Sequence, residues 1–392
     1  MRNPQDDGHY ELDLTIPKKF SGIGVGEKIL DEVNGRLRHI VYRTTNPTKS
    51  STLYIGDYRA IKGIADDIEV ELFQHRTNVA QRKNAKFMLT EITNALKVFN
   101  RMYVPLDIKH LRVTSTMTRH GRGFEGLILL GGRGTEVAES SGADLFRAHE
   151  VAHQWWGNYL RPKRWPEDRW LSEAFAEYSA MEYYKIRFDD PAATIDIMTK
   201  QWIRPLTEGT THTTSLTGEK EVKRGGTVYP IAAGFSNVYT KGPMVLQMLR
   251  YLFDSTLQKD AFLPMLQDFL KTYRYKSAST DDFQAIAEQH LGSGLDWFFE
   301  QWIERGGIPI LSWKYSLSQQ EGSWVVRLQA SQEKPQYRLL VPIYFHFPGK
   351  KVAIRPWLIQ EETATRTLKL PAKPTKITLN DNLETLIILR PL

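Results

Sequence analysis

The chain has 392 residues, of which 41% are hydrophobic and 25% charged, a composition typical of a soluble globular protein with about two to three domains. It contains no cysteine, which excludes disulfide bonds, thiol nucleophiles and cysteine-ligated metal sites. The net charge of +7 arises without a long Lys/Arg run, so nucleic-acid binding is not expected. No apolar stretch reaches the length of about 18 residues that a membrane span requires.

Residues 1–60 are expected to be β-structure. Residues 10–16 alternate polar and apolar side chains before Pro17, and residues 37–44 and 52–58 are two further strand candidates. So few strands would leave sheet edges unpaired, so we expect this segment either to add to a neighbouring sheet or to be the C-terminal part of a larger N-terminal β-domain. Residues 1–7 lack the apolar core of a signal peptide. Because the N-terminus looks trimmed, a secreted or periplasmic parent protein is compatible with the sequence, and the compartment stays open.

Residues 61–305 mix helical and strand patterns and are expected to form the central domain. Helices are predicted over residues 85–99, 143–158, from about 170, over 245–253, after Thr280 and over 295–304, and strands over 111–114 and 127–130. Residues 306–392 contain about seven short strand candidates separated by turn residues, which predicts an immunoglobulin-like β-sandwich. The predicted fold class is therefore α+β.

The most specific motif is His149-Glu150-Val151-Ala152-His153. At 3.6 residues per turn the two histidines lie about 40° apart on one helix face, as two ligands of one zinc ion would. Glu150 lies beside that face, within reach of a water on the metal. The structural alternative is a helix with two buried, hydrogen-bonded histidines. The motif favours zinc hydrolysis, with one zinc per chain.

A catalytic zinc needs a third protein ligand, which leaves the fourth position for water. The best candidate is Glu173, in the segment Trp170-Leu171-Ser172-Glu173-Ala174-Phe175-Ala176. Glu177 lies one helical turn later on the same face and is the alternative, either as ligand or as an acceptor that orients a histidine. Glu167 and Asp168 are expected to face solvent. The nearby tryptophans, Trp155, Trp156, Trp165 and Trp170, are expected in the core rather than in a substrate platform.

These motifs, with His153-Gln154-Trp155-Trp156-Gly157-Asn158, resemble the zinc aminopeptidases of the aminopeptidase N and leukotriene hydrolase family, a branch of the gluzincins. Two departures stand out: nineteen residues (154–172) rather than the usual eighteen separate the second histidine from the glutamate, and Ser172 replaces an asparagine. The resemblance implies a thermolysin-like zinc peptidase domain. It also implies that most of the family's N-terminal β-domain is missing from residues 1–60.

The resemblance assigns further residues. Tyr239, in Tyr239-Thr240-Lys241-Gly242, matches the tyrosine that donates a hydrogen bond to the tetrahedral oxyanion, with Tyr229 as the fallback. The segment 121–126, Gly-Arg-Gly-Phe-Glu-Gly, lies where the family has an edge strand that binds the substrate backbone. Within it Gly123 would contact substrate, and Glu125 would hold the free α-amine.

The resulting hypothesis is a zinc-dependent aminopeptidase acting on peptides, with Glu150 as general base. The nearest alternative is a zinc endopeptidase or dipeptidase without a strict requirement for a free amine. A non-catalytic module that carries a structural zinc is the alternative from another class, although such a module would have no use for Glu150. A lipid-epoxide hydrolase has no separate support. Side-chain preference, physiological substrate and oligomeric state are not determined by the sequence.

Overall fold

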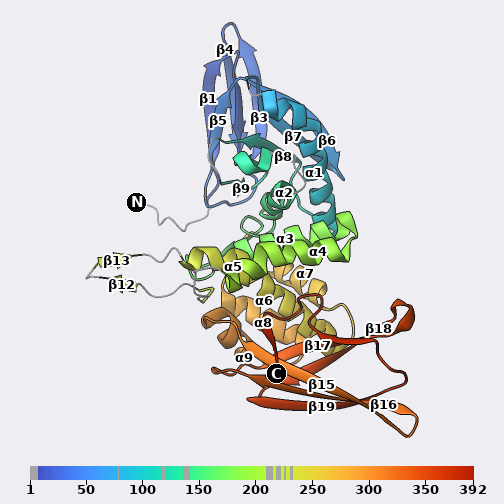
Figure 1. The fold of residues 1–392 in the computed structure, drawn as a ribbon. Helices are drawn as coiled ribbons and strands as arrows, with labels where there is room; N and C mark the ends of the chain where they lie inside the picture. The colour runs from blue at the N-terminus through green and yellow to red at the C-terminus, as the bar shows by residue number, and fades with distance from the viewer. Residues whose placement is uncertain are drawn as a thin grey trace. The chain divides into compact units, whose positions relative to one another are not determined.

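The structure is a computed structural model that describes residues 8–77, 79–116, 120–135, 142–208, 215–217, 222–224, 227–229 and 233–392. The chain divides into two compact units, Met1–Asp189 with Leu266–Thr280 and Asp190–Met265 with Asp281–Leu392. Helices and strands occur throughout the chain, which confirms the predicted α+β class (Figure 1). The expected division into three domains at residues 60 and 305 remains a prediction.

Among the described residues, the strands of the first unit form four sheets, ordered β1-β4-β3, β2-β5, β6-β7-β8-β10-β9 and β11-β14. The strands are β1 (Glu11–Pro17), β2 (Ser21–Gly24), β3 (Glu27–Asn34), β4 (Leu37–Arg43), β5 (Leu53–Gly56), β6 (Tyr58–Ala65), β7 (Ile68–His75), β8 (His110–Ser115), β9 (Arg122–Phe124), β10 (Leu127–Leu130), β11 (Leu160–Pro162) and β14 (Lys276–Ala278). The sequence predicted β1, β4, β5, β8 and β10 but missed β2, β3, β6 and β7.

The five-stranded sheet lies at the centre of the first unit. Strand β10 is apolar along its whole length and almost completely buried, as expected for a strand covered on both faces. It pairs in parallel with β8 and antiparallel with β9, so β9 is the edge strand.

Three helices complete the region that matters for the site: α1 (Val79–Met102), α2 (Ala143–Ala152) and α3 (Trp170–Phe188). Helix α1 lies on β6 and β7, and α2 packs against both α1 and α3 (Figure 1). The predicted apolar stripe of α1, from Ala85 to Phe99, is buried. Helix α2 ends earlier than the predicted residue 158. The backbone tightens to i→i+3 hydrogen bonds at Gln154 and Trp155 and then turns at Gly157, whose φ is +122°.

The helices of the second unit precede a β-rich end. They are α4 (Pro191–Met198), α5 (Arg204–Thr207), α6 (Ala233–Leu257), α8 (Thr280–Leu291) and α9 (Asp296–Phe299), with π-helical turns at Thr199–Ile203 and Glu300–Glu304 and a short hairpin of β12 (Val222–Arg224) and β13 (Thr227–Tyr229). Helix α8 includes Thr280, the last residue of the first unit, and helix α7 (Phe262–Thr272) crosses from the second unit into the first.

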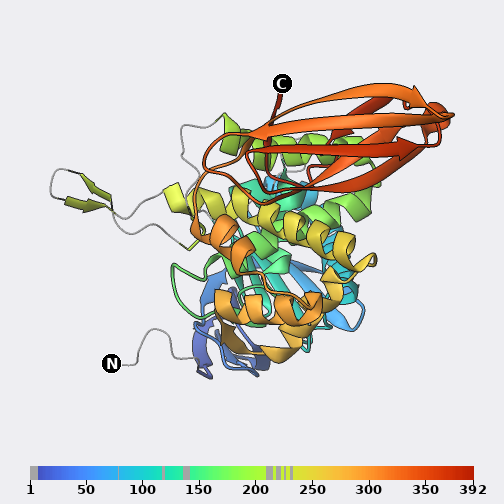
Figure 2. The same cartoon turned by 90° about the horizontal axis from the view of Figure 1, so that it is seen from below.

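Seven strands follow at the predicted places: β15 (Ile310–Gln320), β16 (Ser323–Gln332), β17 (Leu339–His346), β18 (Val352–Ile359), β19 (Thr363–Leu370), β20 (Lys376–Leu379) and β21 (Ile388–Pro391). They form two sheets, ordered β19-β16-β15-β21 and β18-β17-β20, drawn in orange and red in Figure 2. Buried side chains such as Val326, Leu328, Val341 and Ile343 supply the core between them. Among the described residues, no helix is long and apolar enough to cross a membrane.

Candidate metal centre

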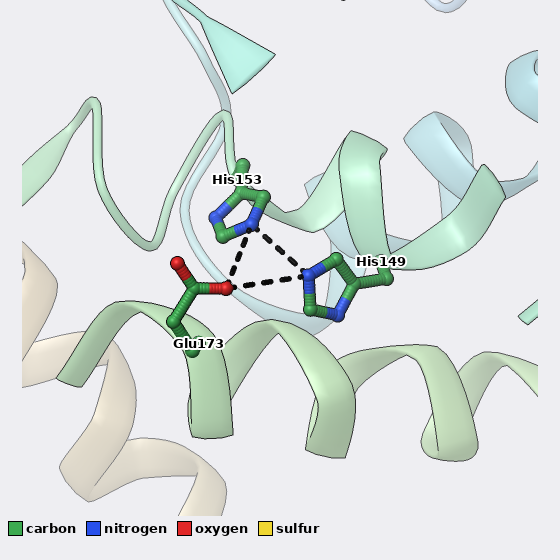
Figure 3. Close-up of side chains that lie close together, drawn as sticks. All are labelled: His149, His153 and Glu173. Atoms are coloured by element: carbon green, nitrogen blue, oxygen red, sulfur yellow. Dashed lines mark hydrogen bonds and ion pairs between the residues drawn. The ribbon is translucent and has the colours of Figure 1, made fainter. Parts of the chain in front are cut away.

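Three side chains converge at the C-terminal end of α2. The Nε2 atoms of His149 and His153 lie 3.1 Å apart, and Glu173 Oε2 lies 3.6 Å from each of them (Figure 3). One donor atom from each residue therefore falls within 4.8 Å of the other two, a grouping that could hold a metal ion. Two histidines come from one turn of α2 and the carboxylate from the first turn of α3, as the motif spacing predicts.

The other ring nitrogen of each histidine is held by an acceptor. His149 Nδ1 lies 3.0 Å from Glu177 Oε2, and His153 Nδ1 lies 2.8 Å from the backbone oxygen of Trp156. Because a carboxylate and a carbonyl oxygen can only accept, each Nδ1 donates its proton. In the neutral imidazole that a metal ion requires, this tautomer places the Nε2 lone pair toward the shared centre. Ser172, where the family has asparagine, also bonds the Trp156 oxygen at 2.9 Å.

The geometry separates the two candidate carboxylates. Glu173 faces both Nε2 atoms, whereas Glu177 faces the Nδ1 side of His149. Burial lowers the pKa of His149, but hydrogen bonds with Glu173 and Glu177 outweigh burial and raise that pKa to about 10. Burial acts to raise the pKa of Glu173, yet its bonds with the two histidines hold that pKa well below the usual range. Without a metal, the cluster therefore holds a proton on His149 against an ionised Glu173.

Glu150 is almost completely buried beside this cluster, with 4% of its surface exposed. Burial raises the pKa of Glu150, and the nearby His153 and His149 lower it in part. A carboxylate whose pKa is raised toward neutrality is suited to accept and return a proton. The Glu150 side chain packs against Gly121, where a Cβ atom would lie only 2.2 Å from Glu150 Oε1, so the glycine leaves room for the Glu150 carboxylate.

Edge strand β9 is fixed to the end of α2 by two amides. Gln154 accepts from the Gly126 backbone N–H and donates to the Phe124 oxygen, both at 2.9 Å, and Asn158 donates to the Gly123 oxygen at 3.3 Å. At Gly123 a Cβ atom would lie only 2.6 Å from His153 Cβ, so a glycine is required for this approach. The strand predicted to bind substrate backbone therefore runs directly past His153, at the edge of its sheet.

Glu125 occupies the two-residue turn between β9 and β10, and its side chain is 7% exposed. Asn46 donates to its Oε1 at 2.6 Å, and burial raises the pKa of Glu125. Its other charged neighbours include Asp107 and Arg161. The predicted role of Glu125 as amine anchor remains a prediction, with Asn46 as its observed partner.

Tyr239 lies on α6 with a partly buried side chain, in the second compact unit, so its distance to the cluster is not described. Tyr229 lies on β13, and its side chain falls outside the described residues. The oxyanion role proposed for either tyrosine therefore remains a prediction.

The loop before α3 differs from the prediction at two residues. Asp168 was expected to face solvent, as Glu167 does, but it is completely buried. It accepts hydrogen bonds from Arg164 and from both the N–H and the hydroxyl of Thr280, so it anchors the loop to the start of α8 within the first unit. Trp165 was expected in the core with Trp155, Trp156 and Trp170, but it is 57% exposed while those three are fully buried. Its ring instead lies over the guanidinium of Arg169.

Arg169 is the functional candidate that the sequence analysis missed. Its Nε lies 3.8 Å from Glu173 Oε1, and it is 5% exposed. The signal that could have revealed it is the four-residue spacing of Arg169 and Glu173, which places opposite charges on one helix face.

A second group of metal-compatible donors lies on the five-stranded sheet: Glu69 and Glu71 of β7 and His110 of β8. Lys62 of β6 lies 2.8 Å from Glu69 Oε1 and 3.3 Å from Glu71 Oε1. An ammonium group therefore already neutralises these carboxylates.

Residues 128–302 match the peptidase family M1 domain. The chain is 23% identical over 332 residues to aminopeptidase M1-D of Oryza sativa subsp. japonica, covering 79% of this chain and 36% of the relative. It is 30% identical over 174 residues to tricorn protease-interacting factor F2 of Thermoplasma volcanium, covering 42% of this chain and 20% of the relative.

Among solved structures, aminopeptidase A of Legionella pneumophila, crystallised in complex with aspartic acid, matches with a TM-score of 0.77 at 14% identity. That match covers 99% of this chain and 46% of the Legionella chain, and at this identity it supports the fold. The chain thus spans less than half the length of these relatives.

Proposed function

Because residues 128–302 match the peptidase family M1 domain, we propose that the chain is a zinc-dependent aminopeptidase that removes amino-terminal residues from peptides. The observation that carries the proposal is the convergence of His149 Nε2, His153 Nε2 and Glu173 Oε2 beside the buried Glu150. Two imidazoles and one carboxylate are a donor set used by catalytic zinc sites.

The residues present fit a zinc ion. Both Nδ1 atoms are occupied by acceptors, so both Nε2 atoms point their lone pairs at the centre. When bound there, zinc polarises the scissile carbonyl and lowers the pKa of a bound water to about 7. His149, His153 and Glu173 would hold the ion, and Glu177 would orient His149.

The chain's own groups carry the proton transfers. Glu150 accepts the proton of the attacking water and returns it to the leaving amine, a role that its burial and raised pKa favour. Tyr239 donates its O–H to the developing oxyanion. The backbone of β9 pairs with the extended substrate beside Gly123, as a sheet edge can. Glu125 pairs with the substrate ammonium, which would discriminate against blocked amino termini.

The substitution Glu150→Gln tests the mechanism. The amide keeps the shape of the side chain but cannot accept the water's proton, so turnover of aminoacyl anilides should fall about 10²–10⁴-fold while bound zinc is unchanged. Turnover unchanged with zinc still bound would contradict the mechanism and leave a non-catalytic zinc module as the alternative.

Paired peptides with free and acetylated amino termini test the exopeptidase assignment. Cleavage should be confined to the free form, and Glu125→Gln should reduce that preference. Equal rates on both peptides would assign the chain to the zinc endopeptidases instead. Tyr239→Phe should lower kcat about 10²–10³-fold with little change in KM, because an oxyanion donor acts only in the transition state.

A further inference from the structure

Arg169 occupies the position before the first residue of α3, and its Nε lies 3.8 Å from Glu173 Oε1 one helical turn later. Glu173 turns its other oxygen, Oε2, toward the two histidines, and Figure 3 shows the remaining oxygen turned away from His149. The guanidinium therefore contacts the oxygen of Glu173 that does not face the metal-binding centre.

This position is unfavourable for a cation on two grounds. The N-terminal end of a helix carries partial positive charge and favours acidic side chains. Burial of a charge to 5% exposure also costs free energy unless the charge is paired. Two neighbours offset these costs, the Glu173 carboxylate and the ring of Trp165, whose centroid lies 5.3 Å from the guanidinium carbon. The structure thus places a buried guanidinium at a helix N-terminus, beside the outer oxygen of a candidate metal ligand, and such a departure from a local rule is expected at functional sites.

We propose that Arg169 is a positioning residue for the metal ligand Glu173. Through this ion pair at 3.8 Å it attracts Oε1 and so favours the orientation of the carboxylate in which Oε2 faces the histidines, while the exposed ring of Trp165 lies beside the guanidinium. This inference rests on the proposed function, since it assumes that Glu173 ligates zinc.

The charges around the centre support the same role. Glu150, Glu173 and Glu177 supply three carboxylates, and a zinc ion supplies two positive charges. Arg169 adds the third positive charge at the outer oxygen of Glu173. At that outer oxygen the guanidinium balances the third negative charge and does not occupy the space between the three donor atoms.

The experiment measures zinc affinity by competition with a chromophoric chelator, together with thermal unfolding of the metal-free protein. Arg169→Met should weaken zinc binding about 10–100-fold, the range for partners that orient a metal ligand. Arg169→Lys should recover part of the loss. The matched control is Arg164→Met. Arg164 lies in the same loop, and its guanidinium also pairs with a carboxylate four residues later, that of Asp168, which is not one of the proposed metal ligands. It should alter zinc affinity less than about twofold.

A purely structural arginine would change unfolding of the metal-free protein but not zinc affinity. Unchanged or tighter zinc binding in Arg169→Met, or an equal loss in Arg164→Met, would overturn the proposal. If Arg169→Met does not fold, Trp165→Ala and Arg169→Lys replace it, and unchanged zinc affinity in both would overturn the proposal as well. Wild-type protein that binds no zinc would instead refute the proposed function, so the two failures are distinguishable.

Discussion

The first compact unit contains two clusters of histidine and glutamate that look alike as lists of donors. In one, His149, His153 and Glu173 converge between α2 and α3, and in the other Glu69, Glu71 and His110 converge on β7 and β8. Each cluster brings three potential ligand atoms within 4.8 Å of one another. They differ in where the neighbouring cations lie.

In the sheet cluster the Lys62 ammonium bonds both carboxylates, and Arg112 Nε lies 3.4 Å from the other oxygen of Glu71. In the helix cluster the guanidinium of Arg169 lies beside the outer oxygen of Glu173, Oε1, with its Nε at 3.8 Å. A donor set thus favours a metal where the nearby cation supports a ligand from outside, and favours an ordinary ion pair where the cation bonds the donor atoms themselves.

The largest effect should come from removing a ligand. If three ligands share a zinc-binding free energy of about 10–16 kcal/mol, Glu173→Ala should weaken zinc binding about a thousandfold. The matched substitution in the sheet cluster, Glu71→Ala, should leave zinc content at about one ion per chain. Metal analysis after dialysis checks both, and zinc loss in Glu71→Ala would break the comparison.

The next effect is pH dependence of zinc binding. The pKa of His149 is raised to about 10 in the metal-free cluster, so below that pH its imidazole holds a proton that zinc must displace. Zinc affinity should therefore rise about tenfold per pH unit across the neutral range, with about one proton released per ion. Titration calorimetry in buffers of different ionisation enthalpy measures the release, and no release at pH 7.5 would contradict the expectation.

A smaller effect should follow from Glu177, which accepts from His149 Nδ1 at 3.0 Å. Glu177→Ala should reduce zinc affinity or kcat/KM about 10–100-fold, because the tautomer and orientation of the ring lose their support. Glu177→Gln keeps an acceptor oxygen and should cost less. Equal losses in both variants would show that charge, and not orientation, is what Glu177 contributes.

The smallest effect belongs to the sheet cluster. Lys62 is more than half exposed, so Lys62→Met should lower the free energy of unfolding by less than about 1 kcal/mol at pH 7 and leave zinc binding unchanged. The hydrogen bond from Lys62 lowers the pKa of Glu69 from its usual 4.5. The contribution of the Lys62–Glu69 pair to the free energy of unfolding is therefore present above pH 4.5. It is lost as pH falls through the lower pKa that Glu69 has in the folded protein. Urea unfolding at pH 7 and pH 3 checks this, and a difference that persists in acid would contradict it.

Several parts of the molecule follow from local sequence. The spacing of His149 and His153 places both rings on one helix face whatever lies around them, because helical periodicity is local. The seven strands of the C-terminal region lie where alternation and turn residues predict them, and the apolar stripe of α1 is buried as predicted. Strand β7 was not predicted, although Ile68-Glu69-Val70-Glu71-Leu72 alternates apolar and acidic side chains as a half-buried strand does.

Only the tertiary structure distinguishes the surroundings of Glu173 from those of Glu177. Four residues apart on α3, they share one helix face, and periodicity treats them alike. The packing of α2 on α3 sets one against the Nε2 atoms and the other against Nδ1. The same holds for Asp168, Trp165 and Arg169, whose burial or exposure depends on α8 and on one another. The sequence by itself determined which residues could bind a metal. The contacts between distant segments decided which group each carboxylate and each cation faces, because the distances between side chains on different elements are set by packing and not by the period of any one helix.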